Sequence, residues 1–336
     1  MILLKVRVLL LALSASVVLN TGIAWAEPGP ADQGVNAWLT RMHEASRQRA
    51  YTGTFVVSAG AKTASAKIWH ICDGTQQMER VEPLSGPPRS TFRHDDQVIT
   101  FFPESKVAVA ETRDSLSLFP NLLKSSDGNI GEWYQLKAIG NERMVGLDSD
   151  VVHLVPKDNA RYGYRVWSEK RTGLVVQLQT LDVDGKVLEQ AAFSELQLDA
   201  PVNMGKLSQM MSATDGYRIE RPDLQKTTAE AQGWAMRKVT AGFKPVGCYL
   251  RPVAALAGSP GRAVRAMQWM FSDGLATVSL FVEPFDGRRH SREGPTDLGG
   301  ATRTVTRRLD GWWITAVGEV PAGTLNNFVQ NLEHRK

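Results

Sequence analysis

The sequence predicts a mainly β protein of two domains, and three observations support this fold class. Many short stretches alternate apolar and polar side chains, as half-buried strands do. Turn signals such as Asp73-Gly74, Thr172-Gly173 and Asp184-Gly185 separate neighbouring stretches and favour antiparallel hairpins. About 310 residues remain after a predicted leader peptide. This length exceeds what a single hydrophobic core usually supports. We therefore expect a mainly β (α+β) fold with two cores.

The first 26 residues have the pattern of a secretory signal. Lys5 and Arg7 precede an apolar run over 8–19, and Ala24-Trp25-Ala26 is a small-x-small cleavage site. The run is too short for a permanent membrane anchor, and no cysteine follows the cleavage site to accept a lipid. With a bacterial-type signal, we expect a mature chain that begins at Glu27 and resides in the periplasm.

Residues 27–200 are predicted to form the first domain. Asp32 precedes a stretch in which apolar side chains recur at helical spacing, which predicts a capped amphipathic helix that buries Trp38 and Met42. A short helix is expected near 115–124. The remaining pattern has a period of two and predicts strands over 51–58, 64–72, 97–102, 106–110, 133–139, 150–155, 162–169, 174–181 and 187–196. A long antiparallel sheet with few helices must curl to cover its apolar face, and the helix carrying Trp38 is the natural filler.

Residues 201–233 are predicted to be a linker, with one Met-rich helical stretch over 206–211. The second domain, 234–336, is smaller and of α+β type. Its expected strands are 236–243, 248–253, 265–271, 276–282, 301–309 and 312–317. Pro321 opens a closing helix whose Leu325, Phe328, Val329 and Leu332 form one stripe. The stretch from 283 to 300, rich in Gly, Pro and charge, is expected to be a loop.

Sequence motifs for catalysis and for cofactors are missing. The six histidines are isolated from one another, so we expect no metal site. No Gly-x-Ser-x-Gly elbow and no phosphate-binding glycine loop occurs, and we expect no catalytic residue and no cofactor. A hydrolase with two carboxylates far apart in the chain stays open as an alternative. Cys72 and Cys248 are either bridged across the domains or two separately buried thiols.

Charge is distributed unequally between the two halves. Residues 27–217 carry 20 basic and 24 acidic side chains, whereas residues 218–336 carry 17 basic and 11 acidic ones. The basic second half indicates an acidic partner or an anionic surface. Export away from the nucleoid argues against nucleic acid as that partner.

The aromatic side chains of the first domain suggest an apolar cavity. The candidates for contact with an acyl chain are Trp38, Met42, Phe55, Trp69, Phe101, Trp133 and Trp167, and Phe102 is a further aromatic residue of the same sheet. For any one of them, a place in an ordinary hydrophobic core is the simpler explanation. Only their number favours a lipid-binding hollow.

Arginine is concentrated in the second domain. Arg303, Arg307 and Arg308 stand beside Trp312, and this density suits bidentate capture of carboxylates or phosphates, so these four residues are the candidate partner contacts. The alternative is a solvated surface, and for Trp312 a place in the core. A second cluster, Arg288-Arg289-His290-Ser291-Arg292, fits a solvated loop.

Several motifs, in order along both domains, resemble the RseB/MucB family of periplasmic regulators of the envelope-stress sigma factor. They are Arg161-Tyr-Gly-Tyr-Arg-Val-Trp167, Leu181-Asp-Val-Asp-Gly185 with Leu188-Glu-Gln190 and Phe193, Phe271-Ser-Asp-Gly-Leu275 with Ser279 and Val282, and Val317-Gly-Glu-Val-Pro321. The resemblance covers both predicted domains. It is weaker over 72–93 and 288–300.

The resemblance implies a first domain similar to the lipoprotein carriers LolA and LolB, a curved open antiparallel β-barrel wrapped around helices. It implies a binding protein and no enzyme. The implied partner is the periplasmic region of a transmembrane anti-sigma factor, which the protein shields from a site-1 protease; lipopolysaccharide or lipoprotein acyl chains relieve the shielding. A periplasmic lipid or lipoprotein carrier is the alternative function. Whether the chain forms a homo-oligomer stays open.

Overall fold

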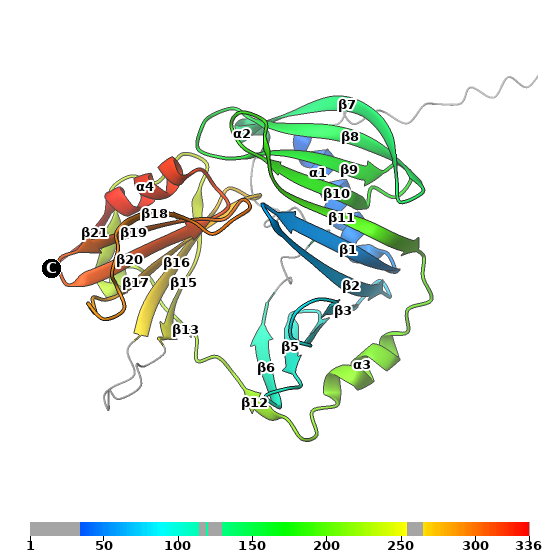
Figure 1. Ribbon diagram of the computed structural model, residues 1–336, viewed down its shortest axis with the longest axis horizontal. Helices are drawn as coiled ribbons and strands as arrows, with labels where there is room; N and C mark the ends of the chain where they lie inside the picture. Colours follow the sequence, from blue (N-terminus) through cyan, green and yellow to red (C-terminus); the bar gives the residue numbers. More distant parts are fainter. Residues whose placement is uncertain (1–33, 114–118, 120–129, 254–264, 336) are drawn as a thin grey trace, which may run out of the picture.

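The computed structural model describes residues 34–113, 119, 130–253 and 265–335 (Figure 1). The predicted signal sequence, Asp32 and, except for Phe119, the short helix expected over 115–124 lie outside these residues. Strands dominate the described chain and fall into two large sheets, so the predicted mainly β fold class is confirmed. In the described part of the chain, no helix is both long enough and apolar enough to cross a membrane.

The first sheet has twelve strands and curves around helix α1 (Val35–Gln48) (Figure 1). Its order is β12-β6-β5-β4-β3-β2-β1-β11-β10-β9-β8-β7, and only the β12–β6 pair is parallel. The strands are β1 (Tyr51–Ala59), β2 (Lys62–Cys72), β3 (Gln77–Pro83), β4 (Ser90–His94), β5 (Gln97–Phe102), β6 (Val107–Thr112), β7 (Tyr134–Met144), β8 (Leu147–Pro156), β9 (Gly163–Glu169), β10 (Val175–Leu181), β11 (Val187–Leu198) and β12 (Arg218–Glu220). Helix α2 (Ile130–Trp133) runs directly into β7.

The two faces of this sheet are covered differently. Trp38, Leu39 and Met42 of α1 are buried on the inner face, where alternate residues of the strands, such as Phe55 and Ile68, surround them. On the outer face, helix α3 (Met204–Ser212) packs against β3 and β4 and closes a separate cluster. The division follows from the strand period of two, which sends successive side chains to opposite faces.

The stretch predicted to be a linker contributes to the first sheet. It contains α3, whose first turn is capped by the Asn203 side chain accepting the Lys206 N–H at 2.8 Å, and it contains β12, which pairs with β6. The remainder of 201–233 leads into the second sheet through β13 (Gln225–Lys226) and a 3₁₀ turn over Glu230–Gln232. The exact domain boundaries stay a prediction.

The second sheet has seven strands in the order β13-β15-β16-β17-β20-β19-β18, with α4 (Ala322–Asn331) packed on β19 and β20. Its other strands are β15 (Lys244–Pro252), β16 (Arg265–Ser272), β17 (Thr277–Pro284), β18 (Gly294–Asp297), β19 (Arg303–Leu309) and β20 (Trp312–Gly318). β14 (Trp234–Met236) pairs with the terminal β21 (Leu332–His334) as a small separate sheet. The predicted loop over 283–300 therefore contains a short strand. The strand predicted over 236–243 is wrong beyond Met236, the last residue of β14, because the chain bends at Arg237 and turns at Gly242.

Candidate functional site

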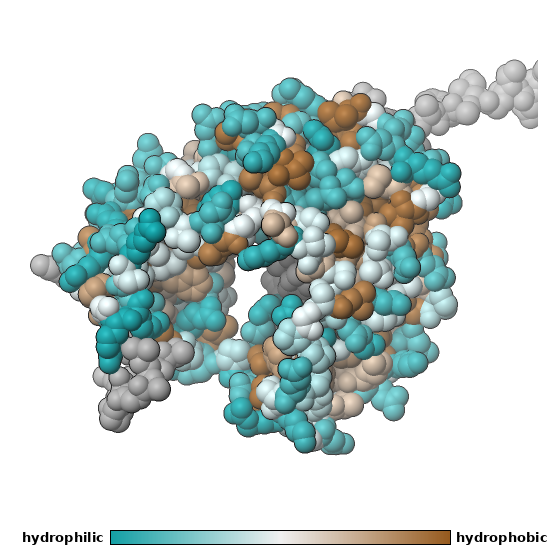
Figure 2. Space-filling view, in the orientation of Figure 1, coloured by the Kyte–Doolittle hydropathy of each residue, from teal (hydrophilic) through white to brown (hydrophobic). Residues whose placement is uncertain are grey.

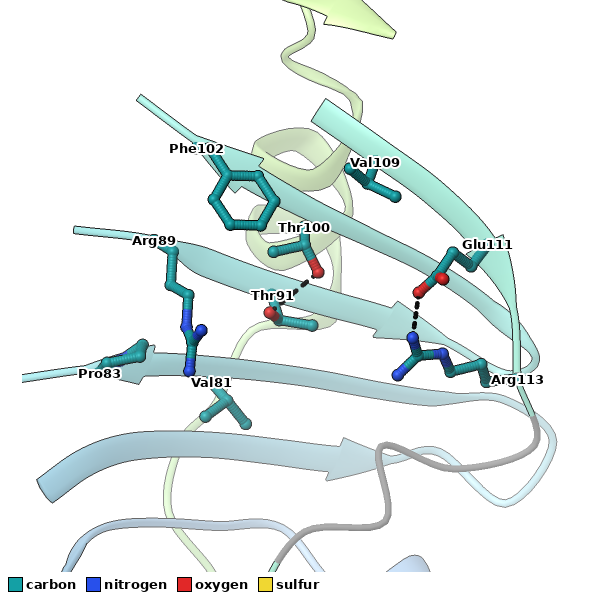
Figure 3. A pocket seen from close by; sticks show the side chains of 9 residues that line it. All are labelled: Val81, Pro83, Arg89, Thr91, Thr100, Phe102, Val109, Glu111 and Arg113. Atoms are coloured by element: carbon teal, nitrogen blue, oxygen red, sulfur yellow. Dashed lines mark hydrogen bonds and ion pairs between the residues drawn. The ribbon is translucent and has the colours of Figure 1, made fainter. Parts of the chain in front are cut away.

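A hollow lies on the inner face of the arm formed by β3 to β6 (Figure 3). Its volume is about 330 Å³, within the range of roughly 300–1,000 Å³ that ligand pockets occupy. Alternate residues of four neighbouring strands supply its floor, because their side chains point to the same face. The apolar lining residues are Val81, Pro83, Phe102 and Val109, and the polar ones are Arg89, Thr91, Thr100, Glu111 and Arg113.

The polar side chains are arranged around the apolar ones. Thr91 and Thr100 hydrogen-bond to each other across β4 and β5 at 3.1 Å, which satisfies both hydroxyls and leaves their methyl groups beside the floor. Arg113 forms an ion pair with Glu111 at 2.5 Å on one side (Figure 3), and the exposed Arg89 stands on the other. The hollow thus combines an apolar floor with the exposed Arg89 guanidinium on one side and the Arg113–Glu111 ion pair on the other. This combination suits an amphiphile with an acyl chain and an anionic group.

Beside the hollow, the inner face carries a buried polar row. His70, Glu79 and Arg93 are all at most 3% exposed, and Arg93 Nη2 lies 3.2 Å from Glu79 Oε2. The His70 ring stacks on Tyr51 with 4.9 Å between centroids, and its Nδ1 lies 2.7 Å from the carbonyl oxygen of Arg49. Burial lowers the pKa of His70 below the ordinary value, so the ring is neutral in the folded chain near pH 7.

The seven candidate lipid contacts do not form one surface. Trp38, Met42 and Phe55 are buried in the core around α1, each at most 4% exposed. Trp69 and Phe101 lie on the opposite face of the sheet, in the cluster covered by α3. Their contact with an acyl chain stays a prediction, and none of the seven lines the hollow.

The remaining two candidates also lie away from the hollow. Trp167 belongs to a third, outer cluster and donates its indole N–H to Glu142 Oε2 at 2.9 Å. Trp133 is half-buried where the two domains meet, and the Arg161 guanidinium lies 4.8 Å from the centre of its ring.

In the second domain, a groove of about 630 Å³ runs between α4 and the β18–β19 hairpin. Its lining residues are Arg237, Glu293, Gly294, Val305, Thr306, Arg307, Asn326, Val329 and Gln330. Arg307 is the one candidate partner contact among them. Its Nη1 lies 3.4 Å from the carbonyl oxygen of Val329 and leaves other guanidinium donors at the groove.

The other three candidate partner contacts are engaged within the chain. Arg303 Nη1 donates to the Gly300 carbonyl at 2.8 Å and to Asp297 Oδ1 at 3.0 Å, which fixes the β18–β19 turn. The Arg308 guanidinium lies 4.0 Å from the centre of the Phe285 ring. Trp312 packs edge-on against Trp234, with 5.6 Å between centroids. Their contact with a partner stays a prediction.

The described residues show few features of a metal-binding or catalytic site. Within them, no group of three or more His, Cys, Asp or Glu side chains is placed to hold a metal ion. Both cysteines are free thiols, and burial raises the pKa of Cys248 to about 11. In the loop cluster after β17, hydrogen bonds from Arg288 lower the pKa of Asp286 to about 2, so these two side chains neutralise each other at the surface.

Of the residues that line the hollow, only Phe102 was among the aromatic residues from which a cavity was predicted, although the sequence carries a signal that separates it from Phe101. Phe101 and Phe102 are neighbours on β5, so they must point to opposite faces. Only Phe102 shares its face with Thr100 and with the residues of β3, β4 and β6 that line the hollow. A residue-by-residue account of strand faces would have separated the two phenylalanines.

Two family models match the chain: the MucB/RseB N-terminal domain over residues 34–211 and the MucB/RseB C-terminal domain over residues 228–333. The chain is 28% identical to the sigma factor AlgU regulatory protein MucB of Pseudomonas aeruginosa over 327 residues, covering 93% of this chain and 94% of that protein. It is 25% identical to the sigma-E factor regulatory protein RseB of Haemophilus influenzae over 342 residues, covering 98% and 99%.

Solved structures of MucB are also similar to this chain. The complex structure of Pseudomonas aeruginosa MucA/MucB matches with a TM-score of 0.69 and 26% identity, covering 90% of this chain and 99% of that chain. The crystal structure of MucB in complex with MucA(peri) matches with a TM-score of 0.68 and 25% identity, covering 89% and 98%. The similarity therefore extends over both domains.

Proposed function

Because the chain belongs to the MucB/RseB family, a family of regulatory binding proteins and not of enzymes, we propose that it binds the periplasmic region of a membrane anti-sigma factor. Bound there, it shields that region from site-1 proteolysis in the periplasm. Lipopolysaccharide or lipoprotein acyl chains relieve the shielding by binding to the first domain.

One observation carries the binding part of this proposal. Relatives named as sigma factor regulators match over nearly the whole chain, and the fold is similar to that of MucB in its complexes with MucA. The basic second domain supplies complementary charge for an acidic segment. Steric cover of a protease site needs about micromolar affinity, or roughly −8 kcal/mol, which an interface of standard size supplies.

The hollow of the β3–β6 arm supports the lipid part. Its floor accepts an acyl chain through Phe102, Val81 and Val109, and the exposed Arg89 meets a phosphate or carboxylate at the edge. Burial of apolar chain carbons contributes about 0.8 kcal/mol per CH₂ group. A single chain therefore binds reversibly, as relief of shielding requires.

Calorimetric titration tests the proposal. The mature chain, residues 27–336, is titrated with the purified periplasmic region of the anti-sigma factor from the same organism, with and without a diacylated lipopeptide or lipopolysaccharide. The proposal predicts about micromolar or tighter binding that either lipid weakens. Lipid binding without any binding of the anti-sigma region would instead favour the alternative function, a periplasmic lipid carrier.

A further inference from the structure

The two domains meet at a buried ion pair between Arg161 and Asp273, which are 112 residues apart in the chain. Arg161 belongs to the β8–β9 connection of the first domain, and Asp273 to the tip of the β16–β17 hairpin of the second. Both side chains are 0% exposed, and Arg161 Nε lies 2.9 Å from Asp273 Oδ2. These residues fall in two of the motifs, Arg161–Trp167 and Phe271–Leu275, by which the family was first suggested.

Each of the three nitrogen atoms of the Arg161 guanidinium donates a hydrogen bond. Besides Asp273, its Nη1 donates to Asp158 Oδ2 at 2.6 Å, and its Nη2 donates to the carbonyl oxygen of Ala241 at 2.7 Å. Ala241 lies in the second domain, so two of these three contacts cross between the domains. A buried charge is tolerated where it is paired with an opposite charge and hydrogen-bonded, as here.

Aromatic rings and a glycine complete the cage around this guanidinium. Its central carbon lies 4.8 Å from the ring centre of Trp133 in the first domain and 5.3 Å from that of Phe243 in the second. Gly242 has a φ of +85°, and a Cβ at this position would approach both Arg161 Nη2 and the Trp133 ring to 2.7 Å. The close approach of the two domains at this point therefore requires glycine.

The hairpin tip is rigid before it meets the first domain. Asp273 Oδ1 accepts the backbone N–H groups of Leu275 and Ala276 at 3.0 and 2.8 Å, which fixes the turn and orients the carboxylate. Its other oxygen, Oδ2, accepts from Arg161 and from the Tyr134 hydroxyl, which lies 3.3 Å away. Burial raises the pKa of Tyr134 well above its ordinary value, so the phenol keeps the proton that it donates.

An apolar contact accompanies the ion pair. Leu275, one residue beyond the turn glycine, is 1% exposed and belongs to the core cluster of the first domain, around α1, rather than to the cluster of its own sheet. Two further hydrogen bonds cross between the domains, from Thr324 Oγ1 to the Ala160 carbonyl oxygen at 2.7 Å and from the Ala301 N–H to Glu189 Oε2 at 3.4 Å. Farther along, Figure 2 shows an opening between the second sheet and the β3–β6 arm. The angle at which the domains meet therefore determines the width of the opening.

We infer that Arg161, Asp273 and Leu275 form an interdomain latch: they are positioning residues that hold the two domains in one arrangement and thereby set the affinity for a partner that contacts both domains. The partner-affinity part rests on the proposed function; the arrangement itself does not. Loss of the Asp273 carboxylate leaves the buried guanidinium paired only with Asp158 of its own domain, so the ion pair no longer joins the two domains and their separation is favoured.

Pulsed electron spin resonance distances between the domains test the latch. Spin labels are placed at the exposed positions Leu84→Cys and Val246→Cys, in a background where Cys72→Ala and Cys248→Ala remove the native thiols. We expect one narrow distance distribution for the otherwise unchanged chain. Asp273→Asn keeps an oxygen for the turn N–H groups but removes the charge that faces the guanidinium, and it should broaden the distribution.

The matched control is Asp158→Asn, because Asp158 contacts the same guanidinium from within the first domain. This control should leave the distribution narrow. If Asp273→Asn fails to fold by circular dichroism, Arg161→Lys serves instead, since lysine retains the charge but cannot reach three acceptors. A distribution as narrow as that of the unchanged chain, for whichever of the two variants folds, overturns the latch.

Binding of the anti-sigma region by the same variants gives the second readout. Asp273→Asn should weaken it about tenfold, within the usual range of coupling between sites, while Asp158→Asn should leave it within about twofold. Equal binding by both variants, with the distances broadened, contradicts the link between arrangement and affinity. If the unchanged chain fails to bind at all, the proposed function is wrong, and the distances still decide whether the latch exists.

Discussion

Truncation of Leu275 to alanine should loosen the first domain, although Leu275 belongs to the second. The side chain is 1% exposed and packs in the core cluster around α1. The change removes three buried carbons, which at about 0.8 kcal/mol each contribute about 2.4 kcal/mol. The cavity left behind raises the typical total cost to about 2–5 kcal/mol. We expect this free energy to be lost from the association of the two domains.

Hydrogen–deuterium exchange with mass spectrometry resolves where the loss falls. A cost of about 2.4 kcal/mol corresponds to roughly 50-fold faster exchange in segments that exchange through undocking. For Leu275→Ala, we expect this acceleration in α1 and at the start of β7 as well as in the β16–β17 hairpin. The control is Val278→Ala: Val278 lies three residues further along and is fully buried in the second core. It should accelerate exchange in the second sheet only.

One outcome refutes this reasoning directly. If Leu275→Ala accelerates exchange only within the second sheet and leaves α1 and β7 unchanged, Leu275 contributes to the core of its own domain. Docking of the two domains would then rest on polar contacts, namely those of Arg161 and the hydrogen bonds Thr324–Ala160 and Ala301–Glu189. The proposed latch would lose its apolar component.

Three further predictions concern the polar row, the hollow and the groove. Because burial lowers the pKa of His70, the unfolded chain takes up a proton that the folded chain resists; the free energy of unfolding should fall as pH falls from about 7 to 5. His70→Asn should reduce that fall in urea titrations, and an unchanged fall would contradict this assignment. Phe102→Glu should abolish binding of a diacylated lipopeptide with the fold retained by circular dichroism; unchanged binding would place the lipid elsewhere. Arg307→Glu should weaken binding of the anti-sigma region at least about fivefold and flatten its salt dependence, and it should do so more than Arg308→Glu, whose guanidinium is stacked on a ring of its own domain.

Strong periodicity made part of the fold predictable. Helix α1 and strands β8 to β11 were predicted because apolar residues at helical or alternating spacing dominate each of them. Strands β3 and β4 were missed since the inner face of each carries a charge where an apolar residue is expected. Glu79 and Arg93, both 3% exposed, neutralise each other across the two strands, and a single strand does not reveal its partner.

The sequence predicts an apolar site on the first sheet, but it does not predict which face of the sheet forms that site. Aromatic residues at alternating positions indicate a sheet with buried faces, yet they do not say which face a helix covers. Trp69 and Phe101 are covered by α3, whose position depends on the chain returning after β11. The face that forms the hollow was therefore identifiable only in three dimensions.

The latch residues illustrate the same limit over a longer range. Arg161 and Asp273 each lie in a recognisable motif, but the sequence offers no indication that the two motifs touch. The contact depends on how the hairpin tip of one domain meets Arg161 and Tyr134 of the other. Such complementarity is a property of two assembled surfaces.

The central claim is that this chain shields an anti-sigma factor from proteolysis, and a protection assay tests it most directly. The purified periplasmic region of the anti-sigma factor is incubated with the site-1 protease, with and without an excess of the mature chain, and cleavage is followed by gel electrophoresis. We expect the mature chain to slow cleavage strongly, and lipopolysaccharide or a diacylated lipopeptide to restore it. Cleavage at the same rate with and without the mature chain, while cleavage of an unrelated substrate confirms that the protease is active, would contradict the account.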